Sequence, residues 1–150
     1  MSIVSNRKVF HDFFIEDRYE AGLVLEGWEV KSIRDGKVQL KDSYVKAKNG
    51  ELWLFGCHIS PSISTSTHVR ADADRIKKLL LNKKEIDRLT GKTIEKGYSI
   101  VALSLYFKKG VVKVEIALAK GKKLYDKRST EKEKEGLREK AAALKKYKRL

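Results

Sequence analysis

The sequence predicts a mainly β protein with flanking helices, and three observations carry this prediction. Asn49 and Gly50 separate two runs of alternating apolar and polar residues, which is the strongest short signal for a β-hairpin. A second pair of alternating runs, residues 98–107 and 111–119, is divided by a turn that ends in Gly110. Between the two pairs, residues 83–95 place apolar side chains at helical spacing.

The N-terminal residues 6–15 predict a first strand, because they are rich in aromatic side chains, which follow the basic residues Arg7 and Lys8. We expect three of its side chains to lie in the core or at the rim of the fold: Phe10, Phe13 and Phe14.

The next segment predicts a turn followed by a long strand. Residues 17–21 predict a single helical turn that closes at Gly22. Residues 23–33 alternate in two registers, and the change of phase at Gly27 predicts a β-bulge. Residues 34–41 predict a turn or a short helical element.

The first hairpin is predicted to join residues 44–48 to residues 51–59. In its second strand the two faces carry Leu52 and Leu54 on one side, and Trp53, Phe55 and Cys57 on the other. Residues 60–68 are rich in Ser and Thr around one proline and predict an exposed loop.

Two helices are predicted over residues 72–81 and 83–95. Their apolar stripes are Ile76, Leu79 and Leu80 in the first, and Ile86, Leu89 and Ile94 in the second.

Together these elements make about six strands and two to three helices. A small closed antiparallel barrel of the OB type accommodates them economically, because closure removes exposed strand edges. We assign residues 1–120 to this body and residues 121–150 to a basic tail. The tail places acidic residues before basic ones but has a narrow apolar face, so it predicts a helix that forms only against a partner.

Composition indicates a polyanionic partner. The chain carries 34 Lys and Arg against 20 Asp and Glu, a formal net charge of +14, and the last 30 residues hold half of this excess. One cysteine, Cys57, excludes an intramolecular disulfide and a cysteine-clustered zinc site, and its apolar surroundings predict a buried, inert thiol. The sequence has no apolar run long enough to span a membrane and no secretory signal, so we expect a cytoplasmic protein.

The residue patterns in the sequence favour a binding function over a catalytic one. The three histidines have no metal-ligand spacing and there is no phosphate loop, so we expect no metal and no cofactor. Two alternatives stay open: a generic basic RNA-binding barrel, and an RNA-cleaving or metal-dependent enzyme built on His11, His68 and Glu20.

Several stretches in order along the chain resemble one family, the SsrA-binding or SmpB proteins. They are residues 6–8 (Asn-Arg-Lys), 11–12 (His-Asp), 20–22 (Glu-Ala-Gly), 28–32 (Trp-Glu-Val-Lys-Ser), 41–45 (Lys-Asp-Ser-Tyr-Val), 58–61 (His-Ile-Ser-Pro), 75–81 with 85–89, 105–108 (Leu-Tyr-Phe-Lys), 121–123 (Gly-Lys-Lys) and 126–128 (Asp-Lys-Arg). The resemblance implies an OB-type barrel and a non-enzymatic adaptor of trans-translation. Such an adaptor binds the tRNA-like domain of transfer-messenger RNA (tmRNA) and helps to deliver its alanyl form to ribosomes stalled on messages without a stop codon.

The resemblance also implies site residues and partners. The implied tmRNA contacts are Glu20, Leu80 and Lys113, with Asn6, Arg7 and His11 as additions. The implied contacts in the ribosomal decoding centre and mRNA channel are Gly121, Lys122, Lys123, Tyr125, Asp126, Lys127, Arg128 and Leu144. The expected partners are tmRNA, the stalled ribosome and elongation factor Tu within the alanyl-tmRNA complex, with no membrane, and the protein is expected to be a monomer.

Overall fold

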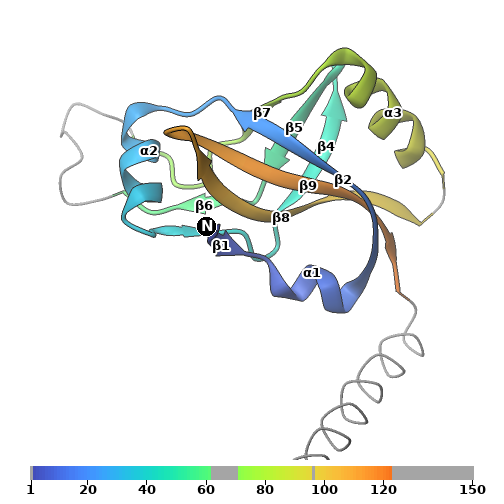
Figure 1. The fold of residues 1–150 in the computed structure, drawn as a ribbon, viewed down its shortest axis with the longest axis horizontal. Coiled ribbons are helices and arrows are strands. Elements are labelled where there is room, and N and C mark those ends of the chain that lie inside the picture. The colour runs from blue at the N-terminus through green and yellow to red at the C-terminus, as the bar shows by residue number, and fades with distance from the viewer. Residues whose placement is uncertain (1, 62–70, 96, 123–150) are drawn as a thin grey trace, which may run out of the picture.

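Six strands close into an antiparallel ring in the computed structural model, which describes residues 2–61, 71–95 and 97–122. The order around the ring is β8 (Tyr98–Lys108), β4 (Tyr44–Lys48), β5 (Glu51–Phe55), β7 (Lys77–Leu80), β2 (Phe13–Leu23) and β9 (Val111–Gly121), which pairs back to β8. The predicted closed antiparallel arrangement is therefore confirmed (Figure 1). Three further strands lie outside the ring: β1 (Ser2–Ser5) extends β8, and β3 (Val38–Gln39) pairs with β6 (His58–Ile59).

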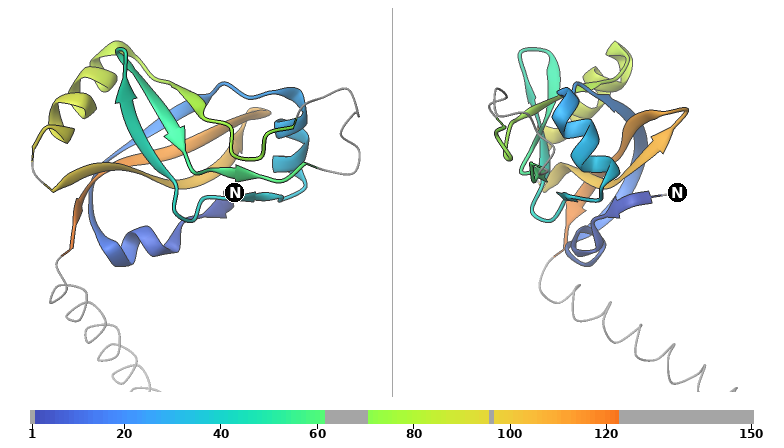
Figure 2. Two further views of the ribbon diagram at one scale, coloured as in Figure 1. Left: turned by 180° about the vertical axis from the view of Figure 1, so that it is seen from behind. Right: turned by 90° about the vertical axis from the view of Figure 1, so that its left-hand side faces the viewer.

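Three helices flank the ring in the described part of the chain: α1 (Arg7–Asp12), α2 (Gly27–Arg34) and α3 (Lys83–Thr93). Helices α2 and α3 lie at opposite ends of the long direction of the molecule, as the front and back views show (Figures 1 and 2). Helix α1 lies beside the end of β9, from which the chain continues toward its C-terminus.

The prediction for residues 6–15 is wrong over α1 and correct only from Phe13 onward. Helix α1 buries Val9, whereas Phe10 and Phe14 are 42% and 46% exposed and do not belong to the core. The helical turn predicted for residues 17–21 is also wrong, because β2 continues through it with an irregularity between Ile15 and Arg18.

Helix α2 replaces the second half of the strand predicted for residues 23–33. A capping box starts this helix: Glu26 and Glu29 each accept a hydrogen bond from the other's backbone N–H. Trp28, Glu29, Ser32 and Ile33 form its buried face, at the 3.6-residue spacing of a helix and not at the alternation of a strand. The turn or helical element predicted for residues 34–41 is confirmed over residues 34–36, where α2 ends and a turn follows, and is wrong at Val38 and Gln39, which form β3.

The helix predicted for residues 72–81 is wrong, because residues 77–80 form strand β7. Leu79 faces the core, while Ile76 and Leu80 are exposed. Lys77 is fully buried, and its amino group lies 3.7 Å from the equally buried carboxylate of Glu29. A buried lysine is tolerated only with such a partner, and this pairing joins positions 48 residues apart.

Both predicted hairpins are confirmed. Asn49 and Gly50 have φ of 55° and 75°, and Lys109 and Gly110 have 52° and 79°, the left-handed conformations that two-residue hairpin turns require. The strand predicted for residues 51–59 is interrupted at Gly56, whose φ is 73° and where a Cβ would lie 2.8 Å from a backbone oxygen.

Helix α3 is confirmed with Ile86 and Leu89 buried, but Ile94 lies just beyond it and is 84% exposed.

A main core fills the ring, and a second small cluster of Val9, Val101, Leu103, Ala117 and Ala119 packs near α1. An irregularity between Ala102 and Ser104 turns Leu103 to the second cluster and Leu105 to the main one.

Cys57 is buried as predicted, and burial raises the pKa of its thiol to about 11, which keeps the thiol protonated at neutral pH. The loop predicted over residues 60–68 lies outside the described residues from position 62 onward, and so does the conditional tail helix.

Candidate nucleic-acid interface

Three adjacent strands bring Leu80, Gly22 and Lys113 into one row on the outside of the ring. Gly22 of β2 is paired with Leu80 of β7 on one side and with Lys113 of β9 on the other. A Cβ placed on Gly22 would lie 3.5 Å from Leu80 Cδ1 and 3.7 Å from Lys113 Nζ. The two side chains therefore converge above the glycine, which leaves room for an apolar group and a cation to lie together.

Glu20 lies two residues along β2 from Gly22, on the same face. Its carboxylate accepts a hydrogen bond from Lys108 Nζ at 3.2 Å and another from the Tyr106 hydroxyl. The Lys108 bond is the main reason that the pKa of Glu20 is lowered. Burial, followed by the bond to Glu20, raises the pKa of Tyr106 to about 12, so the phenol stays a neutral donor at physiological pH.

These residues form what we call the Leu80 surface: Glu20, Gly22, Leu80, Tyr106, Lys108 and Lys113. Leu80 is 52% exposed although it lies in a strand, and the Lys113 amino group approaches it above Gly22. A hollow of about 410 Å³ continues from Leu80 toward Lys78 and Lys83. An exposed apolar side chain beside cations suits a nucleotide, whose base and sugar are flat or apolar and whose phosphate is anionic.

The other predicted tmRNA contacts lie at the opposite end of β2. Asn6 precedes α1 and is buried, and its side-chain amide donates to the carbonyls of Leu40 and Ala102, at 3.2 Å each. Arg7 is exposed at the start of α1, and His11 near its end lies 3.1 Å from Asp12 Oδ1. Seven residues of β2, Phe13 to Tyr19, lie between α1 and Glu20 and span roughly 23 Å of strand, so the structure does not bring the six residues together.

Residues that begin the tail lie beside α1. Gly121 is paired with Phe13, and the backbone N–H of Lys122 donates to the Asp12 carbonyl at 2.9 Å. The Lys122 amino group lies 5.0 Å from the centre of the Phe14 ring, within the range of a cation–π contact. The remaining predicted tail contacts fall outside the described residues: Lys123, Tyr125, Asp126, Lys127, Arg128 and Leu144.

The described ranges offer neither a metal cluster nor a membrane-spanning helix. No group of three or more His, Cys, Asp or Glu side chains there is arranged to hold a metal ion. None of the helices there has the length and apolar character needed to cross a membrane. His58 pairs with Asp74 at 2.9 Å on the exposed surface, and His68 lies outside the described part.

The sequence was compared with models of protein families. The model described as "SmpB protein" matches residues 3–146, nearly the whole chain.

This chain belongs to the SmpB family.

Curated relatives agree with the SmpB assignment. The SsrA-binding protein of Bordetella pertussis is 59% identical over 97% of this chain and 94% of its own length. That of Chromobacterium violaceum is 60% identical over 97% of this chain and 96% of its own. A chain in the solved structure described as "tmRNA-SmpB: a journey to the center of the bacterial ribosome" is 43% identical, with a TM-score of 0.67, and the match covers 81% of this chain and 85% of that one. The resemblance seen in the sequence is thus confirmed.

Part of the site in this SmpB chain was not predicted from the sequence. Gly22, Tyr106 and Lys108 were not proposed as contributors. The sequence predicted a turn of three residues, 108–110, whereas β8 extends to Lys108 and the turn has only two residues, which places Tyr106 opposite Lys113. The convergence on Gly22 carried no local signal, because it depends on the pairing of β2 with both β7 and β9.

Proposed function

We propose that this chain is a non-enzymatic RNA-binding adaptor of trans-translation, which binds tmRNA and acts with it on stalled ribosomes. Membership of the SmpB family and the names of its relatives support the proposal. The observation that carries it at the level of residues is the convergence of Leu80 and Lys113 above Gly22.

The Leu80 surface is proposed to hold the tRNA-like domain of tmRNA. Lys113 and Lys108 supply positive charge for the phosphate backbone, and half-exposed Leu80 packs against a sugar or base. Glu20 orients Lys108 and Tyr106, and its carboxylate can also accept from a ribose hydroxyl or a base N–H. Because these hydrogen bonds hold the side chains in place before RNA binds, the side chains lose less conformational entropy on binding.

The α1 side is proposed to act with the tail. His11 lies near the end of α1 that contacts Lys122, at the far end of β2 from Leu80, so the additional tmRNA contacts proposed at Asn6, Arg7 and His11 lie on the side from which the tail leaves. Residues 121–150 are proposed to occupy the decoding centre and the empty mRNA channel, through Gly121, Lys122, Lys123, Tyr125, Asp126, Lys127, Arg128 and Leu144. Their basic character suits a channel lined by RNA.

Three finer proposals follow from the same function. The protein acts in the cytoplasm, where ribosomes translate. It binds tmRNA as a monomer, and elongation factor Tu joins the alanyl-tmRNA complex.

Competition for binding tests the proposal against a generic basic RNA-binding protein. Labelled tRNA-like domain is bound to the full chain at moderate salt, and unlabelled tRNA-like domain or an unrelated structured RNA is added. We expect the tRNA-like domain to compete at least tenfold better, since specific contacts add to the salt-dependent attraction that any RNA feels. Equal competition would overturn the tmRNA assignment.

A further inference from the structure

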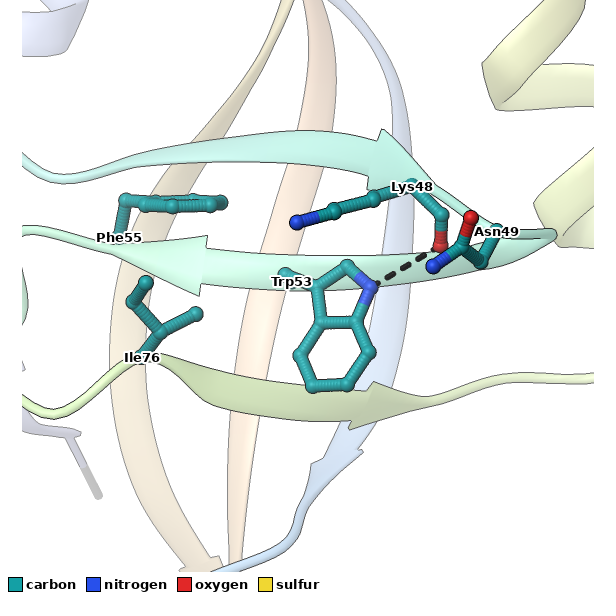
Figure 3. Close-up of a pocket in the computed structure, with 5 residues that line it drawn as sticks. All are labelled: Lys48, Asn49, Trp53, Phe55 and Ile76. Carbon is teal, nitrogen blue, oxygen red and sulfur yellow. Dashed lines mark hydrogen bonds between the residues drawn. The ribbon is translucent and has the colours of Figure 1, made fainter.

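Aromatic side chains gather on the outside of β4 and β5, in a region without an assigned role. Phe55 stacks on Tyr44 with ring centroids 5.3 Å apart and ring planes 2° apart. Trp53 lies on the same face of β5, two residues before Phe55. With Ile76, which is 46% exposed, Trp53 and Phe55 line a hollow of about 400 Å³, a size typical of small-ligand sites (Figure 3).

The Trp53 ring is held in place by its own polar atom. Its Nε1 donates to the Lys48 carbonyl at 3.1 Å, across the Asn49 and Gly50 turn (Figure 3). Trp28, the other tryptophan, is 6% exposed and donates to Glu26 instead. Because the indole N–H is satisfied within the protein, the ring faces of Trp53 are what the hollow offers to a ligand, and a flat ligand can stack on them without costing a hydrogen bond.

Positive charge surrounds these rings. Lys48 lines the hollow, and Figure 3 shows its side chain extending between Trp53 and Phe55. The Lys46 amino group lies 5.4 Å from the centre of the Tyr44 ring. Stacking faces beside lysines are the combination that binds unstacked bases of RNA, because the rings take the base and the cations take its phosphates.

The hollow is continuous with the Leu80 surface along the sheet. Trp53 is paired with Lys78, which lies two residues from Leu80 on the same face of β7. That spacing is about 7 Å, so the two regions are neighbours on the surface of the sheet. An ion pair of Lys78 with Glu51 at 3.8 Å lies between the two regions. One RNA can therefore lie across both without leaving the surface.

We propose that the hollow between Trp53, Phe55 and Ile76 binds an unstacked base of the tRNA-like domain of tmRNA. This inference rests on the proposed function, because the RNA is the one that the Leu80 surface holds. Trp53 supplies the stacking face, Lys48 contacts the adjoining phosphate, and the base comes from a loop or bulge, where bases are free to leave the helical stack.

Tryptophan fluorescence of the full chain tests the proposal directly. A base that stacks on an indole quenches its emission, so saturating tRNA-like domain should quench the wild-type chain. The Trp53→Phe variant should lose this quenching and still bind nearly as tightly, since a phenyl ring also stacks. Trp53→Ala and Phe55→Ala should each weaken binding about tenfold. Ile94→Ala, at an apolar position that is 84% exposed beyond α3, is the matched control and should change neither signal.

Each outcome separates this inference from the proposed function. Suppose that Lys113→Ala weakens binding, that Trp53→Ala binds like the wild type, and that the tRNA-like domain does not quench the wild-type emission. The proposed stacking site is then wrong, while the proposal for the Leu80 surface stands. Quenching by ribosomes alone, with none by the tRNA-like domain, would give the hollow a different occupant and also overturn the inference. If the tRNA-like domain binds no better than unrelated RNA, the proposed function fails as well.

Discussion

Gly22 and Leu80 face each other across β2 and β7 so closely that a Cβ on Gly22 would lie 3.2 Å from the Leu80 Cβ. That separation is tighter than an ordinary side-chain contact. On the other side of Gly22, the same Cβ would lie 3.7 Å from Lys113 Nζ. The glycine thus sets the positions of the two side chains that we propose to contact RNA.

Gly22→Val should therefore weaken tmRNA binding by about tenfold, because the added methyl groups push Leu80 out of place. The free energy of unfolding should fall by only about 1 kcal/mol, since Leu80 is half exposed and can move. Gly121→Val is the matched control, as a Cβ there meets no atom within 4 Å. Filter binding and thermal unfolding measure both effects. Equal affinity of Gly22→Val and wild type would refute the role of Gly22.

Lys113→Ala should flatten the salt dependence of tmRNA binding. A lysine that contacts one phosphate contributes about one unit to the slope of log affinity against log salt. Lys31→Ala removes an exposed lysine on α2 and should leave the slope unchanged, although the net charge changes equally. The affinity is measured for each variant over a range of salt concentrations. Parallel slopes for the wild type and Lys113→Ala would contradict the phosphate contact.

Tyr106 should titrate at unusually high pH. Its pKa is raised from 10.0 to about 12, mainly by burial and then by the bond to Glu20. A raised pKa means that the neutral phenol is favoured by folding, so this contribution to stability is complete below pH 10 and is lost as the pH rises toward 12.

The difference in phenolate absorbance between wild type and Tyr106→Phe isolates this group. Glu20→Gln should move the titration to lower pH, because the carboxylate charge that disfavours the phenolate is gone. A Tyr106 titration at its ordinary value in the wild type would contradict the Glu20–Tyr106 pairing.

Glu29→Ala should destabilise the protein by about 3–5 kcal/mol, because it leaves the buried charge of Lys77 without a carboxylate and with only the carbonyls of Cys57 and Arg75 as partners. Glu29 lies 2.6 Å from Arg75 Nη2 and 3.7 Å from Lys77 Nζ, and both Glu29 and Lys77 are fully buried. Arg88→Ala breaks an exposed ion pair with Asp17 and should cost under about 1 kcal/mol. Denaturant unfolding compares the two variants. Similar losses in both would show that the buried ion pair does not hold α2 to β7.

Elements whose conformation depends only on neighbouring residues, such as the hairpin turns, were predicted correctly from the sequence. The hairpins follow from Asn49–Gly50 and Lys109–Gly110, whose left-handed backbone needs nothing from the rest of the chain. Helix α2 was missed although Glu26 and Glu29 form a capping box, because the Gly27 between them suggested a bulge. The capping signal was present and was outweighed by an apparent strand pattern.

Long-range pairing explains the remaining differences. Lys77 looks like a solvated helix residue in sequence, but its buried amino group donates to the carbonyls of Cys57 and Arg75 and lies near the distant carboxylate of Glu29. For the same reason the resemblance supplied Leu80 and Lys113 as separate residues, and only the pairing of both with Gly22 shows that they form one surface.

The most direct test of the account is a truncation after Lys122, which keeps β9 complete and removes residues 123–150. At 0.15 M salt its affinity for the tRNA-like domain should stay within about threefold of the full chain, because charges more than roughly 8 Å from the RNA are screened. Peptide tagging on stalled ribosomes should be abolished. Loss of tmRNA binding in parallel with tagging would contradict the division between an RNA-binding body and a ribosome-binding tail.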